Sequence, residues 1–131
     1  MKLSRILETV LYATNLAEAE TFYTKLLERE PYDQVSGRYL FYKLDEEMLL
    51  LFNPEATSTD NQGIPTHGTY GRGHVCFRIE EDQLEAWKSR LAGLRVTLEL
   101  EHTWPNGTKS LYFRDPAGNS IELASWRIWN R

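Results

Sequence analysis

Apolar and polar residues follow two patterns along the chain, one typical of β-strands and one of α-helices. Residues 6–13, ILETVLYA, are mostly apolar and are followed by polar residues, which predicts a strand. In residues 16–30 apolar side chains recur every three or four positions, and Asn15 precedes them as a candidate helix cap. Three further strands are predicted at residues 32–35, 38–44 and 47–52.

The second half of the chain repeats this order of elements. Residues 73–79 predict a strand, and residues 80–94 predict a helix with one apolar stripe. Three strands are predicted at residues 95–104, 110–114 and 120–126, separated by the turns PNG and DPAGN. Both halves therefore read βαβββ, which predicts an α+β fold. Because one helix and a small sheet are hard to stabilise alone, two four-stranded sheets are expected to face each other, within the chain or across a dimer.

The repeat also predicts the domain organisation. We expect a single domain over residues 1–131, with module one at about 4–53, a linker at 54–72 and module two at 73–131. The linker is rich in Gly, Thr, Pro and polar residues, so it is expected to be a long loop. Loops of that length are usually functional or mobile.

Composition narrows the class of protein. Hydrophobic residues make up 41% of the 131 residues and charged residues 26%, which is ordinary globular usage and excludes disordered, collagen-like and coiled-coil chains. The net charge is −4 and the basic residues are scattered, so no surface for nucleic acid or an anionic membrane is expected. With no membrane-spanning run or secretion signal, the expected location is the cytoplasm. The single cysteine, Cys76, is expected to be a buried, inert thiol, with a reactive thiol as the alternative.

Three polar residues interrupt the predicted strands at places related by the repeat. Glu8 and His74 occupy matching positions in the first strand of each module, and Glu122 lies in the last strand between Ile121 and Leu123. Each alone has an ordinary explanation, such as an exposed glutamate or a hydrogen-bonded structural histidine. An unpaired buried carboxylate is costly, however, and one imidazole with two carboxylates suits a divalent metal. Together the three residues indicate a metal site.

Three segments carry a resemblance to a known family: residues 8–27, residues 71–79 and SLYFRDPAGNSIEL at 110–123. The chain resembles the vicinal oxygen chelate superfamily, also called the glyoxalase, bleomycin-resistance and dioxygenase family, over residues 5–126. This resemblance implies paired βαβββ modules whose sheets roll into a cup-shaped, barrel-like mixed sheet.

The resemblance also implies roles for individual residues. Glu8, His74 and Glu122 fall on the family's metal-ligand positions, and the implied cofactor is a divalent ion, whether Zn, Ni, Mn, Co or Fe. Tyr112 matches a tyrosine that faces the substrate in several members, so Tyr112 and Glu122 are the predicted catalytic residues. The expected partner is a small oxygen-bearing molecule, in some members with a thiol co-substrate, and a homodimer is expected.

The reaction type stays open between lyase or isomerase, thiol-transfer and dioxygenase chemistry. In glyoxalase I, a member of the family that this chain resembles, the metal site has four ligands, one of them a carboxylate on the last strand of module one. The matching strand here, MLLLF, has Leu49 or Leu50 at that position. Fosfomycin-modifying thiol transferases carry a threonine where this chain has Val10, and ring-cleaving dioxygenases have a histidine where it has Glu8. The alternative to a metal-dependent enzyme is a metal-independent protein that binds and sequesters a small molecule, as antibiotic-binding members do.

Several further residues are candidates for substrate binding. His67, in the linker, is predicted to contact the substrate or act as a base, or else to be an ordinary loop histidine. Trp104 could stack on a substrate or pack beside Pro105. Arg114 could hold an anionic substrate or be a solvated surface residue.

Overall fold

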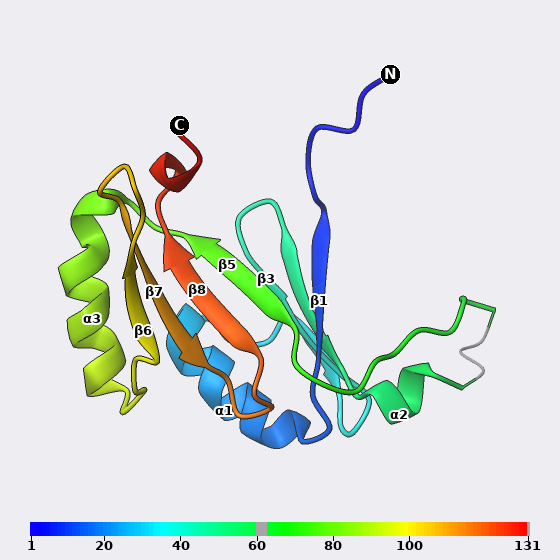
Figure 1. Cartoon of the computed structure of the whole chain (residues 1–131). Helices are drawn as coiled ribbons and strands as arrows, with labels where there is room; N and C mark the ends of the chain where they lie inside the picture. The colour runs from blue at the N-terminus through cyan, green and yellow to red at the C-terminus, as the bar shows by residue number, and fades with distance from the viewer. Residues whose placement is uncertain (60–62, 131) are drawn as a thin grey trace. The chain divides into compact units, whose positions relative to one another are not determined.

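The computed structural model describes residues 1–59 and 63–130 and divides into two compact units, Met1–Arg72 and Gly73–Arg131. Residues 60–62 of the predicted linker, and residue 131, lie outside the described residues. Each unit contains one four-stranded mixed sheet with the element order βαβββ (Figure 1). The α+β fold of two βαβββ modules is therefore confirmed, while the cup that the resemblance implies stays a prediction.

The first unit begins with the predicted strand and helix. Its elements are β1 (Glu8–Tyr12), α1 (Leu16–Leu27), β2 (Asp33–Val35), β3 (Tyr39–Lys43), β4 (Met48–Phe52) and α2 (Pro54–Thr57). The strand order is β1-β4-β3-β2, and β1 runs parallel to β4. As expected, Asn15 caps α1, because its side chain accepts a hydrogen bond from the backbone N–H of Glu18 at 3.1 Å.

The core of the first unit lies between α1 and one face of this sheet. Leu40, Tyr42, Leu49 and Leu51 are almost fully buried there, together with Tyr23 of α1. The Tyr42 hydroxyl lies 2.8 Å from the Thr24 hydroxyl and so ties β3 to the helix. The other face of the sheet carries the alternate residues of each strand, as the two-residue period requires.

One helix, α2, lies where the sequence predicts only a loop. It starts at Pro54, and the Asn53 side chain accepts a hydrogen bond from the Glu55 N–H at 3.0 Å. Asn followed by Pro is a standard helix start, but four residues are too few to show a periodic apolar stripe. The predicted loop is therefore partly helical.

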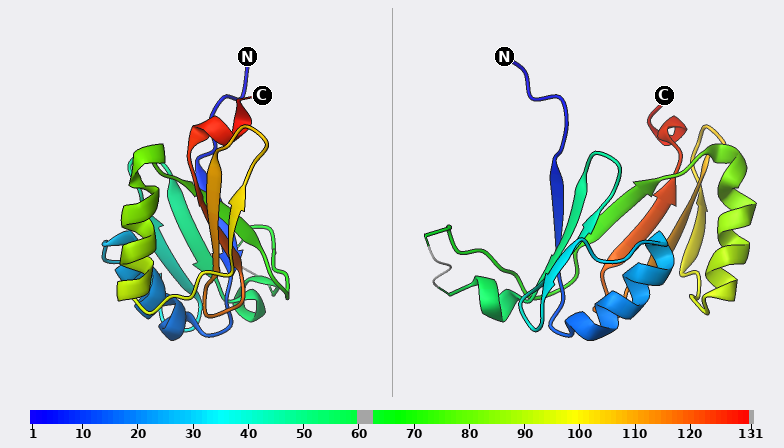
Figure 2. Two further views of the ribbon diagram at one scale, coloured as in Figure 1. Left: turned by 60° about the vertical axis from the view of Figure 1, so that its left-hand side comes forward. Right: turned by 180° about the vertical axis from the view of Figure 1, so that it is seen from behind.

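The second unit repeats the architecture with two short 3₁₀ helices added. Its elements are β5 (His74–Arg78), η1 (Glu81–Gln83), α3 (Leu84–Gly93), β6 (Leu100–Thr103), β7 (Lys109–Arg114), β8 (Ser120–Ala124) and η2 (Trp126–Trp129). The strand order is β5-β8-β7-β6, with β5 parallel to β8. Helix α3 lies along one side of this sheet (Figure 2), and Leu91 of α3 is fully buried. Leu111, Phe113, Ile121 and Leu123 complete this core.

The strand register decides which side chains share the other face. In the second sheet Cys76, Glu122 and Tyr112 lie in one row across β5, β8 and β7. In the first sheet the corresponding row is Val10, Leu50 and Phe41. Of the two leucines considered from the sequence, Leu50 therefore takes the place that Glu122 has in the second unit.

Candidate functional site

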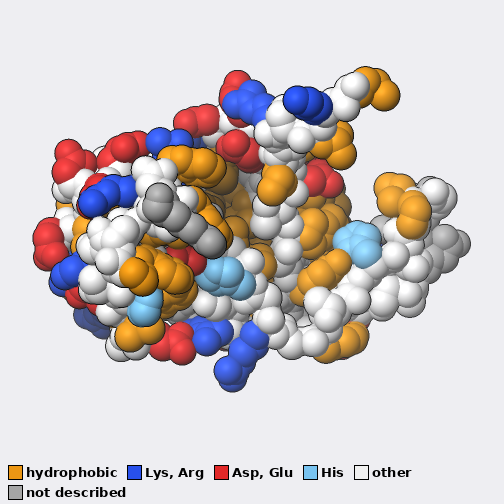
Figure 3. Space-filling view, turned by 45° about the horizontal axis from the view of Figure 1, so that its top comes forward, with side chains coloured by type: hydrophobic (Ala, Val, Ile, Leu, Met, Phe, Trp, Pro, Cys, Tyr) orange, Lys and Arg blue, Asp and Glu red, His pale blue; other side chains and the backbone are white. Residues whose placement is uncertain are grey.

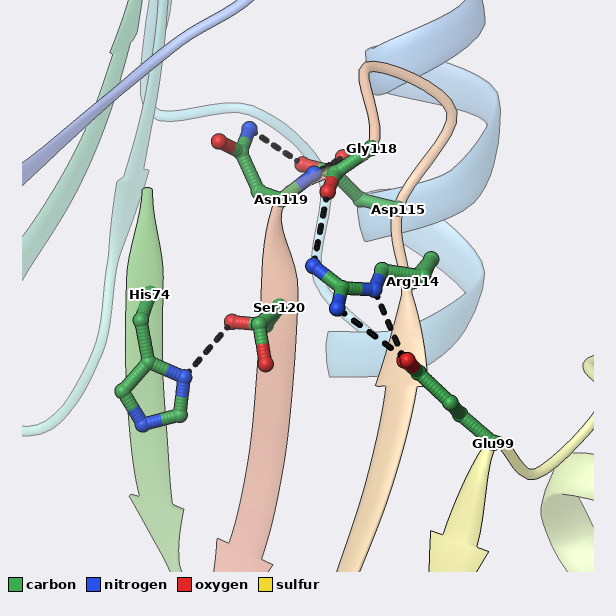
Figure 4. Close-up of polar contacts among 7 residues, drawn as sticks. All are labelled: His74, Glu99, Arg114, Asp115, Gly118, Asn119 and Ser120. Carbon is green, nitrogen blue, oxygen red and sulfur yellow. Dashed lines mark hydrogen bonds and ion pairs between the residues drawn. The ribbon is translucent and has the colours of Figure 1, made fainter. Parts of the chain in front are cut away.

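A tight turn between β7 and β8 positions the candidate site. Within it, Asp115 accepts two hydrogen bonds from Asn119, from the backbone N–H at 2.8 Å and from the side-chain amide at 2.9 Å (Figure 4). The Asn119 side-chain oxygen in turn accepts a hydrogen bond from the Gly73 N–H at 2.7 Å. Gly118 has a φ of 87°, which favours glycine, so the sequence DPAGN suits this turn. The turn is thereby tied to the residue directly before His74.

His74 and Glu122 come together on the face opposite α3. The distance from His74 Nε2 to Glu122 Oε2 is 3.3 Å. The other ring nitrogen, Nδ1, lies 3.1 Å from the backbone oxygen of Ser120 (Figure 4). Because a carbonyl oxygen can only accept a hydrogen bond, the Nδ1–H group donates one to the backbone oxygen of Ser120.

In this tautomer two electron-rich atoms, His74 Nε2 and Glu122 Oε2, face each other. In neutral imidazole with Nδ1 protonated, Nε2 presents a lone pair, and here it faces a carboxylate oxygen. The Glu122 side chain is 8% exposed, and its other oxygen, Oε1, is buried without a hydrogen-bond partner among the described residues. Two electron-rich atoms at this distance are stable only with a cation between or beside them, whether a proton or a metal ion.

Tyr112 borders the pair from the neighbouring strand. Its ring stacks on the His74 ring, with centroids 6.3 Å apart and an interplanar angle of 25°. Burial and the nearby negative charge of Glu122 raise the pKa of the Tyr112 hydroxyl to about 12. The hydroxyl is therefore protonated at neutral pH and can donate a hydrogen bond.

The cysteine expected in the core lies on the same face as the pair. Cys76 has an exposed surface, so the prediction of a buried thiol was wrong. Partial desolvation and the charge of Glu122 nevertheless raise the pKa of the thiol to about 12. The thiol is therefore protonated at neutral pH, and a protonated thiol is a poor nucleophile.

A hollow of about 880 Å³ opens beside these residues, all within the second unit. We call it the tryptophan hollow; its lining consists of His74, Trp104, Pro105, Asn106, Tyr112, Glu122, Ile128, Trp129 and Asn130. Hydrophobic side chains gather beside a histidine in the left part of Figure 3. Its size lies within the range of small-molecule sites, and most of its lining is apolar.

Trp104, a predicted substrate contact, lies in this lining and is also held by packing. Its indole N–H donates to the Ser110 hydroxyl at 2.8 Å, and its ring contacts the edge of His102 at a centroid distance of 4.6 Å. Both sequence-based alternatives, packing and substrate contact, are thus compatible with its position.

Arg114, another predicted substrate contact, is paired away from the tryptophan hollow. Its Nε and Nη2 atoms donate to the two carboxylate oxygens of Glu99 at 2.7 and 3.1 Å (Figure 4). Its Nη1 donates to the backbone oxygen of Gly118 at 3.1 Å. Arg114 is not one of the described residues that line the tryptophan hollow.

Two predicted site residues, Glu8 and His67, belong to the first unit. Glu8 starts β1 and is exposed. His67 Nδ1 lies 2.6 Å from the Tyr12 hydroxyl, and the His67 ring contacts Phe52 edge-on at 4.8 Å. His67 is therefore half-buried and bonded rather than a free loop histidine.

The predicted metal-ligand set is not brought together as a whole by the described residues. Within residues 1–59 and 63–130, no group of three or more His, Cys, Asp or Glu side chains is placed to bind one metal ion. His74 and Glu122 form a pair, and the third ligand, for which Glu8 is the candidate, stays a prediction.

Sequence reasoning missed how the C-terminal segment contributes. Trp129 and Ile128 of η2 line the hollow. The segment is held by Asn106, whose side-chain amide donates to the backbone oxygens of Arg127 at 2.9 Å and Asn130 at 3.0 Å. Asn106 belongs to the turn PNG, and nothing in the local sequence links that turn to residues more than 20 positions later.

Comparison with known proteins identifies the family. The model of the Glyoxalase/Bleomycin resistance protein/Dioxygenase superfamily matches residues 5–123, and the chain belongs to this superfamily. It is similar to the crystal structure of a lactoylglutathione lyase from Agrobacterium tumefaciens, with 40% identity, complete coverage of both chains and a TM-score of 0.94.

Two other comparisons show a partial match and a shared fold. A stretch of 60 residues is 37% identical to the metallothiol transferase FosB of Shouchella clausii strain KSM-K16 and covers 44% of this chain and 41% of that protein. This chain thus matches less than half the length of the transferase. An integron cassette protein from the metagenome of the Halifax Harbour sewage outfall shares the fold at 24% identity and a TM-score of 0.74, over 94% of this chain and 99% of that one.

Over the described residues, the helices are all too short or too polar to span a bilayer.

Proposed function

We propose that this chain is a metal-dependent enzyme in which His74 and Glu122 supply two ligands of a divalent ion. The observation that carries this proposal is the 3.3 Å separation of His74 Nε2 and Glu122 Oε2, with the imidazole proton on the opposite nitrogen. Bonds of about 2.1 Å at angles of about 90 to 110° place two donors on one metal about 3.0 to 3.4 Å apart. The pair fits that requirement.

The surroundings of the pair support the same reading. Metal-binding histidines typically donate their second N–H to a carbonyl or carboxylate, which fixes the ring, and Ser120 accepts that hydrogen bond here. The buried, unpartnered Oε1 of Glu122 is a further acceptor beside the site. Mixed nitrogen and oxygen donors suit Zn, Ni, Mn, Co or Fe. Glu8 remains the sequence-based candidate for a third ligand.

The residues of the second unit suggest how such a site would act on a small molecule. A bound divalent ion would supply Lewis-acid stabilisation to an oxygen of the substrate. The protonated Tyr112 hydroxyl would donate a hydrogen bond to the same region, and Glu122 Oε1 would accept or return a proton. The tryptophan hollow would hold the apolar part of the substrate.

Among the reaction types, lyase or isomerase chemistry has the strongest support, because the lyase from A. tumefaciens is similar over the whole chain. Thiol transfer is supported only by the 60-residue match to the transferase. Leu50 stands in the place of a further carboxylate, so proton transfer would fall to Glu122 or Glu8.

Metal titration tests the proposal. We expect the purified chain to bind one equivalent of Ni²⁺, Zn²⁺ or Mn²⁺ by calorimetry, and His74→Ala and Glu122→Ala to weaken binding at least about 100-fold. Glu85→Ala, an exposed glutamate on α3, is the matched control and should change nothing. Unchanged metal affinity in both site variants, or no metal bound by the wild type, would contradict the proposal. Metal-loaded protein should then be screened with a hemithioacetal, with fosfomycin plus a thiol, and with a catechol.

A second function is favoured by one observation, the large apolar hollow. A metal-independent binding protein would use the tryptophan hollow to sequester a small hydrophobic molecule without turnover. This alternative predicts ligand binding that survives removal of metal by EDTA and is unaffected by Glu122→Ala.

A further inference from the structure

The charges around the tryptophan hollow limit what it can bind. Of its lining residues within the described chain, only His74 and Glu122 are titratable apart from the Tyr112 hydroxyl, and none is Lys or Arg. A divalent ion held by His74 and Glu122 would leave that end of the hollow with a net charge of about +1, enough for one oxygen of a substrate. A ligand with two further carboxylates would find no Lys or Arg among the described lining residues to balance them. The described lining is therefore poorly suited to a ligand with several carboxylates.

Three basic side chains in the described part of the second unit are paired with acids. Arg114 donates two hydrogen bonds to the Glu99 carboxylate, and Lys109 Nζ lies 3.5 Å from Glu101 Oε1. On η2, Arg127 Nη1 donates a hydrogen bond to Glu81 Oε1 at 2.6 Å. Each of these cations would have to give up an existing partner to reach a ligand in the hollow.

Two indole rings, Trp104 and Trp129, form much of the apolar lining of the hollow. Trp104 is oriented by its hydrogen bond to Ser110, and Trp129 belongs to η2, which Asn106 anchors at both Arg127 and Asn130. Trp129 is 61% exposed, so its ring has surface left to cover. Aromatic side chains have few rotatable bonds, so they lose little freedom when a flat ligand packs against them, which favours aromatic ligands.

From these observations, and resting on the metal-dependent function proposed above, we infer the class of substrate. We propose that the substrate is an uncharged aromatic carbonyl or hydroxycarbonyl compound and not an anionic peptide-thiol conjugate. Its ring packs against Trp104 and Trp129, and its oxygens lie toward His74, Glu122 and the Tyr112 hydroxyl. The volume of about 880 Å³ admits a drug-sized molecule.

Two probes that share an aromatic ring but differ in charge test the inference. 2-Hydroxyacetophenone is neutral, while S-benzylglutathione carries two carboxylates and one ammonium group. We expect the metal-loaded protein to bind the neutral probe at least about tenfold more tightly, measured by calorimetry and tryptophan fluorescence. Equal or tighter binding of S-benzylglutathione, or binding of neither probe, would overturn the inference.

The two exposed tryptophans of η2 provide a matched pair of variants. Trp129 lines the hollow and Trp126 does not, although their exposures are similar at 61% and 63%. We expect Trp129→Ala to weaken binding of 2-hydroxyacetophenone about five- to tenfold and Trp126→Ala to change it less than twofold. Equal effects of the two substitutions would contradict the inference, provided that circular dichroism shows both variants folded.

Metal titration separates this inference from the proposed function. Trp129→Ala should bind Ni²⁺ as the wild type does, because Trp129 has no role in holding the metal. If the wild-type protein binds no metal, the metal-dependent function is refuted. Normal metal binding with a preference for the anionic probe would refute only the substrate class.

Discussion

The side chain of Asn119 accepts a hydrogen bond from the backbone N–H of Gly73 at 2.7 Å, across 46 positions of sequence. It joins the β7–β8 turn to the start of β5. Since Gly73 precedes His74 and Asn119 lies three residues before Glu122, this bond helps to set the distance between the two candidate metal ligands. We therefore predict that Asn119 positions the two candidate metal ligands.

Replacement of Asn119 should therefore affect both stability and metal binding. Asn119 is 1% exposed, and its loss would leave the Gly73 N–H and Asp115 without these partners. We expect Asn119→Ala to lower the free energy of unfolding by about 2 kcal/mol or more in urea titrations. We also expect metal affinity, measured by calorimetry at low temperature, to fall about 10- to 100-fold. Ser36→Ala, in an exposed turn of the first unit, is the control, and a stability loss without weaker metal binding would refute the positioning role.

Tyr112 should contribute to ligand binding and not to metal binding. Tyr112→Phe keeps the ring that stacks on His74 and removes the hydroxyl, whose pKa is raised to about 12. We expect about fivefold weaker binding of 2-hydroxyacetophenone, which corresponds to one lost hydrogen bond. Metal affinity should stay within about twofold in the same titrations. A large loss of metal affinity would instead show that the hydroxyl helps to hold the ion.

Arg114 should be structural. Because its guanidinium is exposed and paired with Glu99, Arg114→Ala should lower the free energy of unfolding by less than about 1 kcal/mol. This loss should be smaller still at high salt, which screens the ion pair. Binding of metal and of 2-hydroxyacetophenone should not change. If binding of an anionic probe such as S-benzylglutathione is lost in this variant, Arg114 contacts the ligand as the sequence suggested.

Stability should fall at alkaline pH because of Tyr42. Burial, with smaller contributions from Glu20 and Glu30, raises the pKa of the Tyr42 hydroxyl above its usual value of 10.0. The unfolded chain then loses this proton first as the pH rises, so the stabilisation is complete below about pH 10 and declines above it. Urea titrations from pH 8 to 11 should show a steeper decline for the wild type than for Tyr42→Phe.

The Tyr42 experiment has an internal check. At pH 8 the variant should be less stable by about 1 kcal/mol, because the hydrogen bond between Tyr42 and Thr24 is lost. Tyr70→Phe, at an exposed tyrosine, should keep the wild-type pH dependence. Parallel declines for the wild type and Tyr42→Phe would rule out the assignment.

The sequence predicted those parts of the structure that depend on local periodicity. The repeated βαβββ order, the cap at Asn15 and the DPAGN turn follow from patterns a few residues long. The burial of Cys76 was predicted wrongly because HVCFRI is apolar overall. Its alternation nevertheless places His74, Cys76 and Arg78 on one face of β5.

Other features depend on contacts between distant residues and were not predictable from local patterns. The pairing of Arg114 with Glu99 depends on the register of the β6–β7 hairpin, which brings together two residues that are 15 positions apart. The place of Trp129 in the lining of the hollow depends on Asn106, which bonds to a segment more than 20 residues later. Metal binding at Glu8 and substrate contacts at His67 and Trp104 remain predictions.

The two sheets share one architecture but carry different chemistry in the matching row. Cys76, Glu122 and Tyr112 stand in the second sheet where the first has only apolar side chains. Because the two rows belong to different sheets, a polar residue placed at Leu50 would leave the strand pairing around Glu122 unchanged. The apolar row of the first unit is thus a place where a second set of polar side chains can be introduced by design, independently of the first.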